Sequence, residues 1–121
     1  MTPERRRVLV VDDEVDIREL IVLLLAGAGY AVEVASNGVE ALEKVQKERP
    51  DLIVLDIMMP VLDGWGVLER LRGIPAPPAV VILTAAPDEV RAVRAGAWEC
   101  LEKPLVASTL IEACRRALAA A

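Results

Sequence analysis

Several short apolar segments of this sequence are followed at once by side chains that could bind a metal ion or a phosphate. Asp12 and Asp13 directly follow one apolar run, and Asp56 follows another. Thr84 and Lys103 stand at the ends of two further strand-like segments. A charged residue after a single strand is also expected wherever the chain enters water. These carboxylates, the hydroxyl and the ammonium group can therefore act together only if the fold brings them to one place.

Carboxylates that gather at one place repel one another and raise each other's pKa values, so a cation is needed beside them. Lys103 can supply one positive charge. Mg²⁺ can supply more, because it binds one or two carboxylates together with water and phosphate oxygens. The chain contains no histidine and neither cysteine is close to these carboxylates in sequence, which argues against a zinc site. Beside such cations, the Asp56 carboxylate could attack phosphorus and form an acyl phosphate.

Alternating segments of the chain indicate how these residues are positioned. Apolar runs predict strands at 8–11, 31–35, 52–55, 80–83 and 100–102. Amphipathic segments predict helices at 13–28, 37–48, 64–72, 88–95 and 106–120. This alternation is typical of an α/β fold, in which a parallel sheet lies between two layers of helices. The carboxyl ends of parallel strands share one edge, where such sheets bind ligands. With no linker or repeat, we expect a single domain over residues 1–121.

Composition narrows the class of partner. Of the 121 residues, 55% are hydrophobic and none is Phe, so the core must be aliphatic. The net charge of −5 argues against nucleic acid or an anionic membrane as the main partner. No apolar run approaches the roughly 18 residues of a membrane-spanning helix, and the amino terminus does not resemble a signal peptide. Cys100 and Cys114 are interpreted as reduced thiols, so we expect a cytoplasmic protein.

Four fragments of the sequence resemble the receiver domains of two-component response regulators. They are VLVVDDE (8–14), DLIVLDIMMPVLDG (51–64), VVILTAA (80–86) and AGAWECLEKPL (95–105). Their order and spacing are similar to those of the family, and together they cover nearly the whole chain. The resemblance implies a flavodoxin-like (βα)₅ fold, which is a doubly wound parallel sheet with strand order 2-1-3-4-5.

By position in these motifs, the resemblance implies that Asp56 is the phosphoacceptor of a signal-transduction phosphoprotein. Asp12 and Asp13 correspond to the acidic pair that binds Mg²⁺ together with Asp56. Met58 corresponds to the residue whose backbone carbonyl is a further metal ligand. The expected donor is a histidine kinase or a phosphotransfer protein of a phosphorelay. Beyond phosphorylation and autodephosphorylation at Asp56, we expect no enzymatic activity.

The resemblance also implies a set of switch residues. Thr84 corresponds to the hydroxyl that bonds the phosphoryl group, and Ala85 to the small residue that leaves room for it. Lys103 corresponds to the lysine that pairs with a phosphoryl oxygen, and Pro104 to the proline that follows it, often after a cis peptide bond. Phosphorylation would draw Thr84 toward the phosphate and shift a two-state equilibrium that controls partner binding.

Two departures from the family fall on the face made by the fourth helix, the last strand and the last helix, where relatives exchange partners. Cys100 takes the place of a Tyr or Phe whose ring moves with the threonine. Trp98 has the same strand parity and could cover part of that surface, or could be a partly exposed loop residue. Thr84 and Lys103 are 19 positions apart, roughly three fewer than in the family, which is close to one helical turn. We therefore expect a short fourth helix or a short loop before it.

These departures keep a second interpretation open, a pseudo-receiver that has the site without using it. The downstream effector and a homodimeric state are also left open by the sequence. A haloacid-dehalogenase-like phosphatase is disfavoured, because it needs a second Asp where this chain has Met58. A nucleotide or flavin domain is disfavoured because Asp12, Asp13 and Glu14 would repel a pyrophosphate. Glu14 itself is interpreted mainly as the start of a helix, where negative charge is favourable.

Overall fold

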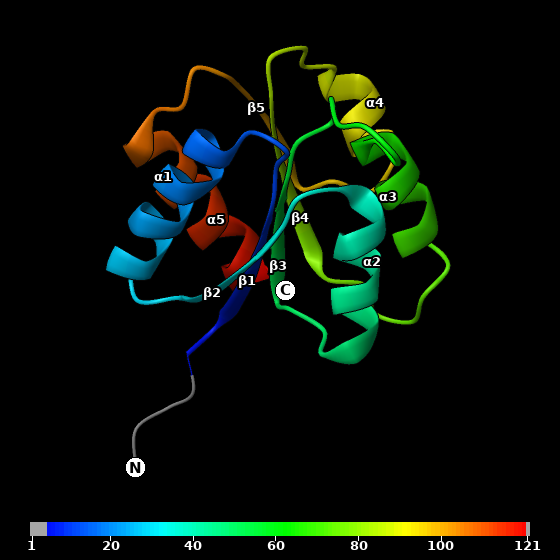
Figure 1. Cartoon of the computed structure of the whole chain (residues 1–121), viewed down its shortest axis with the longest axis horizontal. Coiled ribbons are helices and arrows are strands. Elements are labelled where there is room, and N and C mark those ends of the chain that lie inside the picture. Colours follow the sequence, from blue (N-terminus) through cyan, green and yellow to red (C-terminus); the bar gives the residue numbers. More distant parts are fainter. Residues whose placement is uncertain (1–4, 121) are drawn as a thin grey trace.

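The computed structural model describes residues 5–120, and within them the strands form one five-stranded parallel sheet in the order β2-β1-β3-β4-β5 (Figure 1). The strands are β1 (Arg7–Val11), β2 (Ala31–Ala35), β3 (Leu52–Leu55), β4 (Ala79–Thr84) and β5 (Glu99–Glu102). The order predicted from the sequence is confirmed. Because β1 lies between β2 and β3, the chain changes direction across the sheet at β1, which places a crevice beyond the ends of β1 and β3.

Two layers of helices cover the sheet. On one face lie α1 (Val15–Gly27) and α5 (Ala107–Ala120), and on the other lie α2 (Gly38–Lys47), α3 (Gly64–Leu71) and α4 (Glu89–Arg94) (Figure 1). The predicted helices are confirmed, with ends that differ by at most two residues. With six residues, α4 is the shortest of these helices, as the spacing between Thr84 and Lys103 predicts.

The core consists of two apolar clusters, one on each face of the sheet. Successive residues of β1 alternate between them: Leu9 and Val11 face α2, α3 and α4, whereas Val8 and Val10 face α1 and α5. Strands of a parallel sheet are buried on both faces, which explains the uninterrupted apolar runs in the sequence. The clusters are built from aliphatic, methionine and cysteine side chains. Aromatic rings only pack against their margins, so the expected aliphatic core is confirmed.

Side-chain caps determine where several helices begin. The Asn37 side chain accepts a hydrogen bond from the Glu40 amide at 2.9 Å, and the Glu40 carboxylate accepts one from the Ser36 hydroxyl at 2.8 Å. The first bond satisfies a backbone donor that the helix end leaves open, and the second ties the residue before the cap to the first turn. Only some of the apolar residues of α1 are buried, and Leu20 is exposed. The core-facing residues of α1 are Ile21 and Leu25, four positions apart, and Leu20 lies about 100° around the helix from Ile21.

Candidate functional site

Backbone pairing places the predicted site residues one step beyond the carboxyl ends of adjacent strands. The Asp56 amide donates to the Val11 carbonyl at 2.9 Å, so Asp56 lies beside Asp12, the residue that follows Val11. The Lys103 amide donates to the Thr84 carbonyl at 2.8 Å. The strand ladder therefore continues for one residue into the loops. The structure therefore brings Asp12, Asp56, Thr84 and Lys103 to the same edge of the sheet.

Three carboxylates surround the ammonium group of Lys103. Its Nζ lies 2.9 Å from Glu14 Oε1, 3.1 Å from Asp12 Oδ2 and 3.2 Å from Asp56 Oδ2. The side chains of Asp12 and Asp56 are each only 2% exposed, and that of Lys103 is 11% exposed. Buried charges of this kind persist only when they are paired and hydrogen-bonded. Lys103 is thus the fixed cation of the site.

The second oxygen of each buried carboxylate is held by a backbone amide. Asp12 Oδ1 accepts a hydrogen bond from the Glu14 amide at 2.9 Å, and Asp56 Oδ1 accepts one from the Met58 amide at 3.2 Å. Each carboxylate is therefore fixed at both oxygens, by Lys103 on one side and by its own loop on the other. Sequence spacing predicts these loop contacts, because the acceptor and donor are two residues apart in both loops.

The pKa values of the site reflect burial and crowding. Burial raises the pKa of Asp12 above its ordinary value, and the neighbouring negative charge of Asp56 adds to this, although the Glu14 amide and Lys103 oppose it. Burial alone would lower the pKa of Lys103, but its bonds to Glu14 and Asp12 and the charges of Asp12 and Asp56 outweigh that effect and raise it. The ammonium group is therefore permanently charged at neutral pH, whereas the carboxylates need further positive charge.

The donor set fits a hard divalent cation. Asp12, Asp13, Glu14 and Asp56 each offer a carboxylate oxygen, and these oxygens all lie within 4.8 Å of one another. Four carboxylates gather around one ammonium group, so acidic groups outnumber the basic group of this cluster. Oxygen ligands at this spacing suit Mg²⁺, which keeps part of its water shell and leaves room for phosphate oxygens.

A glycine at the start of α3 brings that helix against the Asp56 loop. A Cβ atom on Gly64 would lie 2.6 Å from the Asp56 carbonyl oxygen and 2.7 Å from the Ile57 Cα. These neighbours are backbone atoms, which cannot move aside as a side chain can. The Gly64 amide also donates to the Ile57 carbonyl at 2.9 Å. Close packing of α3 therefore supports the loop that carries the Asp56 carboxylate.

The residues predicted to act as a switch lie at the same edge of the sheet. Thr84 is fully buried, and its hydroxyl accepts a hydrogen bond from the Ala86 amide at 3.3 Å. Ala85 is exposed beside it. Pro104 is exposed and follows a cis peptide bond with Lys103, as in the family that the sequence resembles. The Met58 side chain is exposed, and its backbone amide donates to Asp56 Oδ1.

The two residues of the altered face lie farther from this edge. Cys100 is buried and pairs with Ile82, one pleat before the pairing of Thr84 with Glu102. It belongs to the cluster under α4 and shares its sheet face with Ile82. Trp98 precedes β5, and its amide donates to the Val80 carbonyl at the opposite end of β4. The structure does not bring Trp98 to Thr84, and its ring is exposed.

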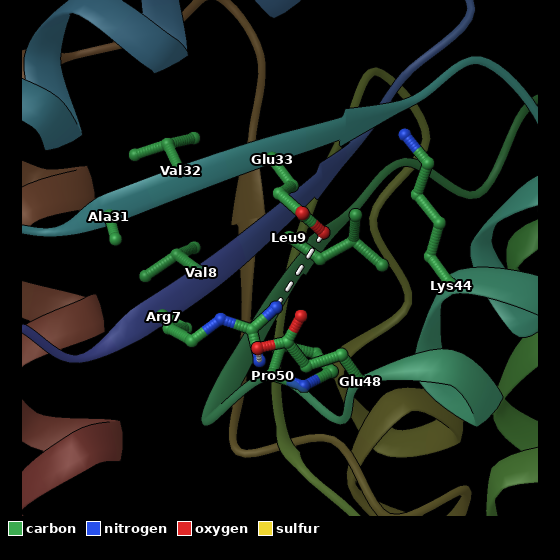
Figure 2. A pocket seen from close by; sticks show the side chains of 9 residues that line it. All are labelled: Arg7, Val8, Leu9, Ala31, Val32, Glu33, Lys44, Glu48 and Pro50. Carbon is green, nitrogen blue, oxygen red and sulfur yellow. Dashed lines mark ion pairs between the residues drawn. The ribbon is translucent and has the colours of Figure 1, made fainter.

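A cavity of about 250 Å³ lies away from this edge, beside the first residues of β1 and β2. Three of its four charged groups are paired with one another, since the Arg7 guanidinium lies 3.3 Å from Glu48 Oε1 and 3.7 Å from Glu33 Oε2, and the fourth, Lys44, lies 3.5 Å from Glu40 Oε1. Figure 2 shows both carboxylates directed at Arg7, with Leu9 close to the Glu33 carboxylate. With its charges already compensated, this cavity offers no group that is ready for a ligand.

Comparison with known proteins identifies the family. The sequence pattern of the response regulator receiver domain matches residues 8–115. The chain belongs to this family. Response regulator MprA of Mycobacterium tuberculosis is 42% identical over 115 residues, which are 93% of this chain and 50% of that protein. The chain therefore spans about half the length of the curated relatives that it matches.

Solved structures agree with this assignment. The chemotaxis protein CheY4 of Vibrio cholerae superposes with a TM-score of 0.85 at 34% identity and covers 94% of this chain and 99% of its own. The receiver domain of NtrX from Brucella abortus superposes with a TM-score of 0.88 at 34% identity, over the same shares of the two chains. The receiver domain described here is thus CheY-like. Across residues 5–120, no helix has both the length and the apolar character needed to cross a membrane.

One site residue was underestimated from sequence. Glu14 does begin α1, as the position before its first residue, but its carboxylate makes no helix cap and instead contacts Lys103. The two residues are 89 positions apart, so no local spacing could reveal the contact. The sequence signal that could have indicated this contact is the run of three acidic residues, Asp12, Asp13 and Glu14, which needs a positively charged partner.

Proposed function

We propose that this receiver domain accepts a phosphoryl group on Asp56 in a Mg²⁺-dependent reaction, and that the modification changes how the domain binds its partners. The expected donor is a histidine kinase or a phosphotransfer protein of a two-component system. The reduced, buried thiols of Cys100 and Cys114 support a cytoplasmic location for this chemistry.

The observation that carries the proposal is the arrangement around Lys103. Its Nζ lies 3.2 Å from Asp56 Oδ2 and 3.1 Å from Asp12 Oδ2, within a cluster of carboxylate oxygens that has excess negative charge. Phosphoryl transfer depends mainly on positioning and on neutralising the charge of the transferred group. A fixed nucleophile, a fixed ammonium group and a donor set that fits Mg²⁺ meet those needs.

In the proposed transfer, a carboxylate oxygen of Asp56 attacks the phosphorus atom of the donor. A P–O bond to Asp56 forms while the P–N bond of the phosphohistidine breaks, and the donor nitrogen leaves with the bonding electron pair. The product is an acyl phosphate on Asp56 and a free imidazole on the donor. Mg²⁺ held by Asp12, Asp13, Asp56 and the Met58 carbonyl would neutralise charge on the phosphoryl oxygens.

Two further residues act on the product. Lys103 is close enough to Asp56 to pair with an oxygen of the bound phosphoryl group. The Thr84 hydroxyl accepts a weak bond from the Ala86 amide at 3.3 Å, and its own proton can be donated to a phosphoryl oxygen. Because Thr84 is buried beside the cluster that packs under α4, its movement would alter the packing of that helix.

Exposed apolar residues border the site and suit a protein donor. Val15 follows the acidic cluster, Val106 precedes α5, and the Met58 side chain stands on the Asp56 loop; all three are exposed. Covering such apolar surface with a partner protein is favourable, so these residues would contribute to docking of the donor.

The test is direct phosphorylation. Protein incubated with Mg²⁺ and acetyl phosphate or phosphoramidate should gain the mass of one phosphoryl group, measured on the intact chain. The Asp56→Asn variant should gain none, because an amide is a poor nucleophile, and EDTA should prevent the gain in the wild type. A wild-type chain that binds Mg²⁺ but forms no adduct with any donor would refute the proposal and favour the pseudo-receiver.

A further inference from the structure

We propose that Glu14 is a positioning residue: its carboxylate holds the Lys103 ammonium group in the resting domain and releases it to the incoming phosphoryl group. This inference rests on the proposed phosphoacceptor role of Asp56 and concerns how the same site is regulated before transfer. It assigns to Glu14 a role separate from metal binding by Asp12 and Asp13.

Three carboxylates already compete for the Lys103 ammonium group in the resting site. An ammonium group carries three N–H donors, and three carboxylate oxygens, from Glu14, Asp12 and Asp56, lie within 3.2 Å of Nζ. A phosphoryl oxygen can therefore pair with Lys103 only if one of these carboxylates gives up its place. The resting geometry thus contains a competitor for the lysine.

Burial decides which carboxylate leaves. The Asp12 and Asp56 side chains are each 2% exposed, and each is also held by a backbone amide. The Glu14 side chain is 59% exposed, and its carboxylate accepts no backbone hydrogen bond among those found in residues 5–120. Moving a buried carboxylate away from its cation is costly, whereas an exposed one can turn into water. Glu14 is the exchangeable partner.

The negative charge of Glu14 also repels anionic phosphoryl donors. Acetyl phosphate and phosphoramidate bring negative charge into a cluster of four carboxylates that is only partly compensated. Removing the charge of Glu14 reduces this repulsion and frees one donor of Lys103. An exposed pair is worth up to about 1 kcal/mol, which corresponds to a change of about fivefold.

The experiment compares Glu14→Gln with the wild type and with Glu19→Gln, which removes the same charge from an exposed position on α1. At saturating Mg²⁺, Glu14→Gln should lower the KM for acetyl phosphate about three- to fivefold with little change in kcat. In titration calorimetry with Mg²⁺ alone, the dissociation constant of Glu14→Gln should be at most about threefold higher than that of the wild type. Glu19→Gln should change neither quantity.

Other results of this experiment would contradict either the role of Glu14 or the phosphoacceptor role of Asp56. An unchanged or higher KM in Glu14→Gln, with a wild type that forms the adduct, would overturn the role of Glu14 and leave the phosphoacceptor proposal intact. A loss of Mg²⁺ affinity of about tenfold or more would also overturn it, since Glu14 would then act as a metal ligand. A wild type that forms no adduct would instead remove the phosphoacceptor proposal and the inference together.

Discussion

The helices on the two faces of the sheet are held to very different extents. On one face, α5 has 14 residues, of which Leu110, Ala113, Cys114, Ala117 and Leu118 are buried. On the other face, α4 has six residues and buries only Ala92. Leucine side chains bury far more apolar area than a single alanine methyl group does. The sheet is therefore firmly covered on the α1 and α5 side and only lightly covered at α4.

The residues of the site lie where these two differently anchored parts of the molecule meet. Asp12, Asp56 and Lys103 are fixed by strand ladders and ion pairs at the edge common to both faces. Thr84 follows Ile82 by one pleat, on the face that packs under α4. A rigid carboxylate–lysine cluster thus shares its edge of the sheet with the strand that packs under the least anchored helix. Elements that move in regulation come from such low-stability parts of a fold.

The largest expected effect is in the core under α5. Leu110→Ala should lower the free energy of unfolding by about 2–5 kcal/mol, because it removes a fully buried side chain and leaves a cavity. Ala92→Gly, on the opposite face, should cost only about 1 kcal/mol. Urea denaturation followed by circular dichroism measures both. Equal losses in the two variants would contradict the proposed difference between the faces.

The pH dependence of the free energy of unfolding should also differ between variants on the two faces of the sheet. Burial, together with the charge of Glu99, raises the pKa of Cys114 from 9.0 to about 12. Between these values the unfolded chain loses the thiol proton while the folded chain keeps it. The unfolded state therefore binds fewer protons, and stability falls as pH rises, by up to about 1.4 kcal/mol per pH unit.

The matched variants for this prediction are Cys114→Ala and Cys100→Ala. Denaturation at several pH values above 9 should show a shallower fall in stability for Cys114→Ala than for the wild type. Cys100 also has a pKa raised by burial, but it lies under the short α4, so its replacement should change the slope less. Identical slopes in the wild type and Cys114→Ala would show that the thiol is not confined as the structure indicates.

Much of this architecture could be predicted from the sequence because it depends on local patterns. Apolar runs located the strands, and the residues directly after them located Asp12, Asp56 and Lys103 at one edge. The short α4 followed from the 19 positions between Thr84 and Lys103.

Other features depend on contacts that sequence spacing does not encode. The Glu14 carboxylate reaches Lys103 across 89 positions, and neither residue alone indicates the other as its partner. Parity places Trp98 on the same side of β5 as Cys100, but parity does not reveal that Trp98 lies at the far end of β4 from Thr84. The stacking of Arg91 on Trp65 joins α4 to α3, and no motif predicts it.

That stack provides the smallest and most local of the expected effects. The Arg91 guanidinium carbon lies 4.1 Å from the centroid of the Trp65 ring, and an exposed cation–π contact is worth about 0.5–1 kcal/mol. Arg91→Ala should therefore lower the global free energy of unfolding by no more than this amount. It should nevertheless speed hydrogen exchange of the α4 amides clearly, because Ala92 is the one residue of α4 that is buried.

Arg94→Ala is the matched variant, since it removes an exposed arginine from the same helix and leaves the Trp65 stack in place. Hydrogen exchange measured by mass spectrometry should separate the two variants at α4 and give equal protection at α5. The same exchange in both would assign the effect to helix propensity or net charge. If the stack does restrain α4, then Arg91→Ala should weaken the resting packing around Thr84, and phosphorylation of Asp56 should add less exchange at α4 in this variant than in the wild type.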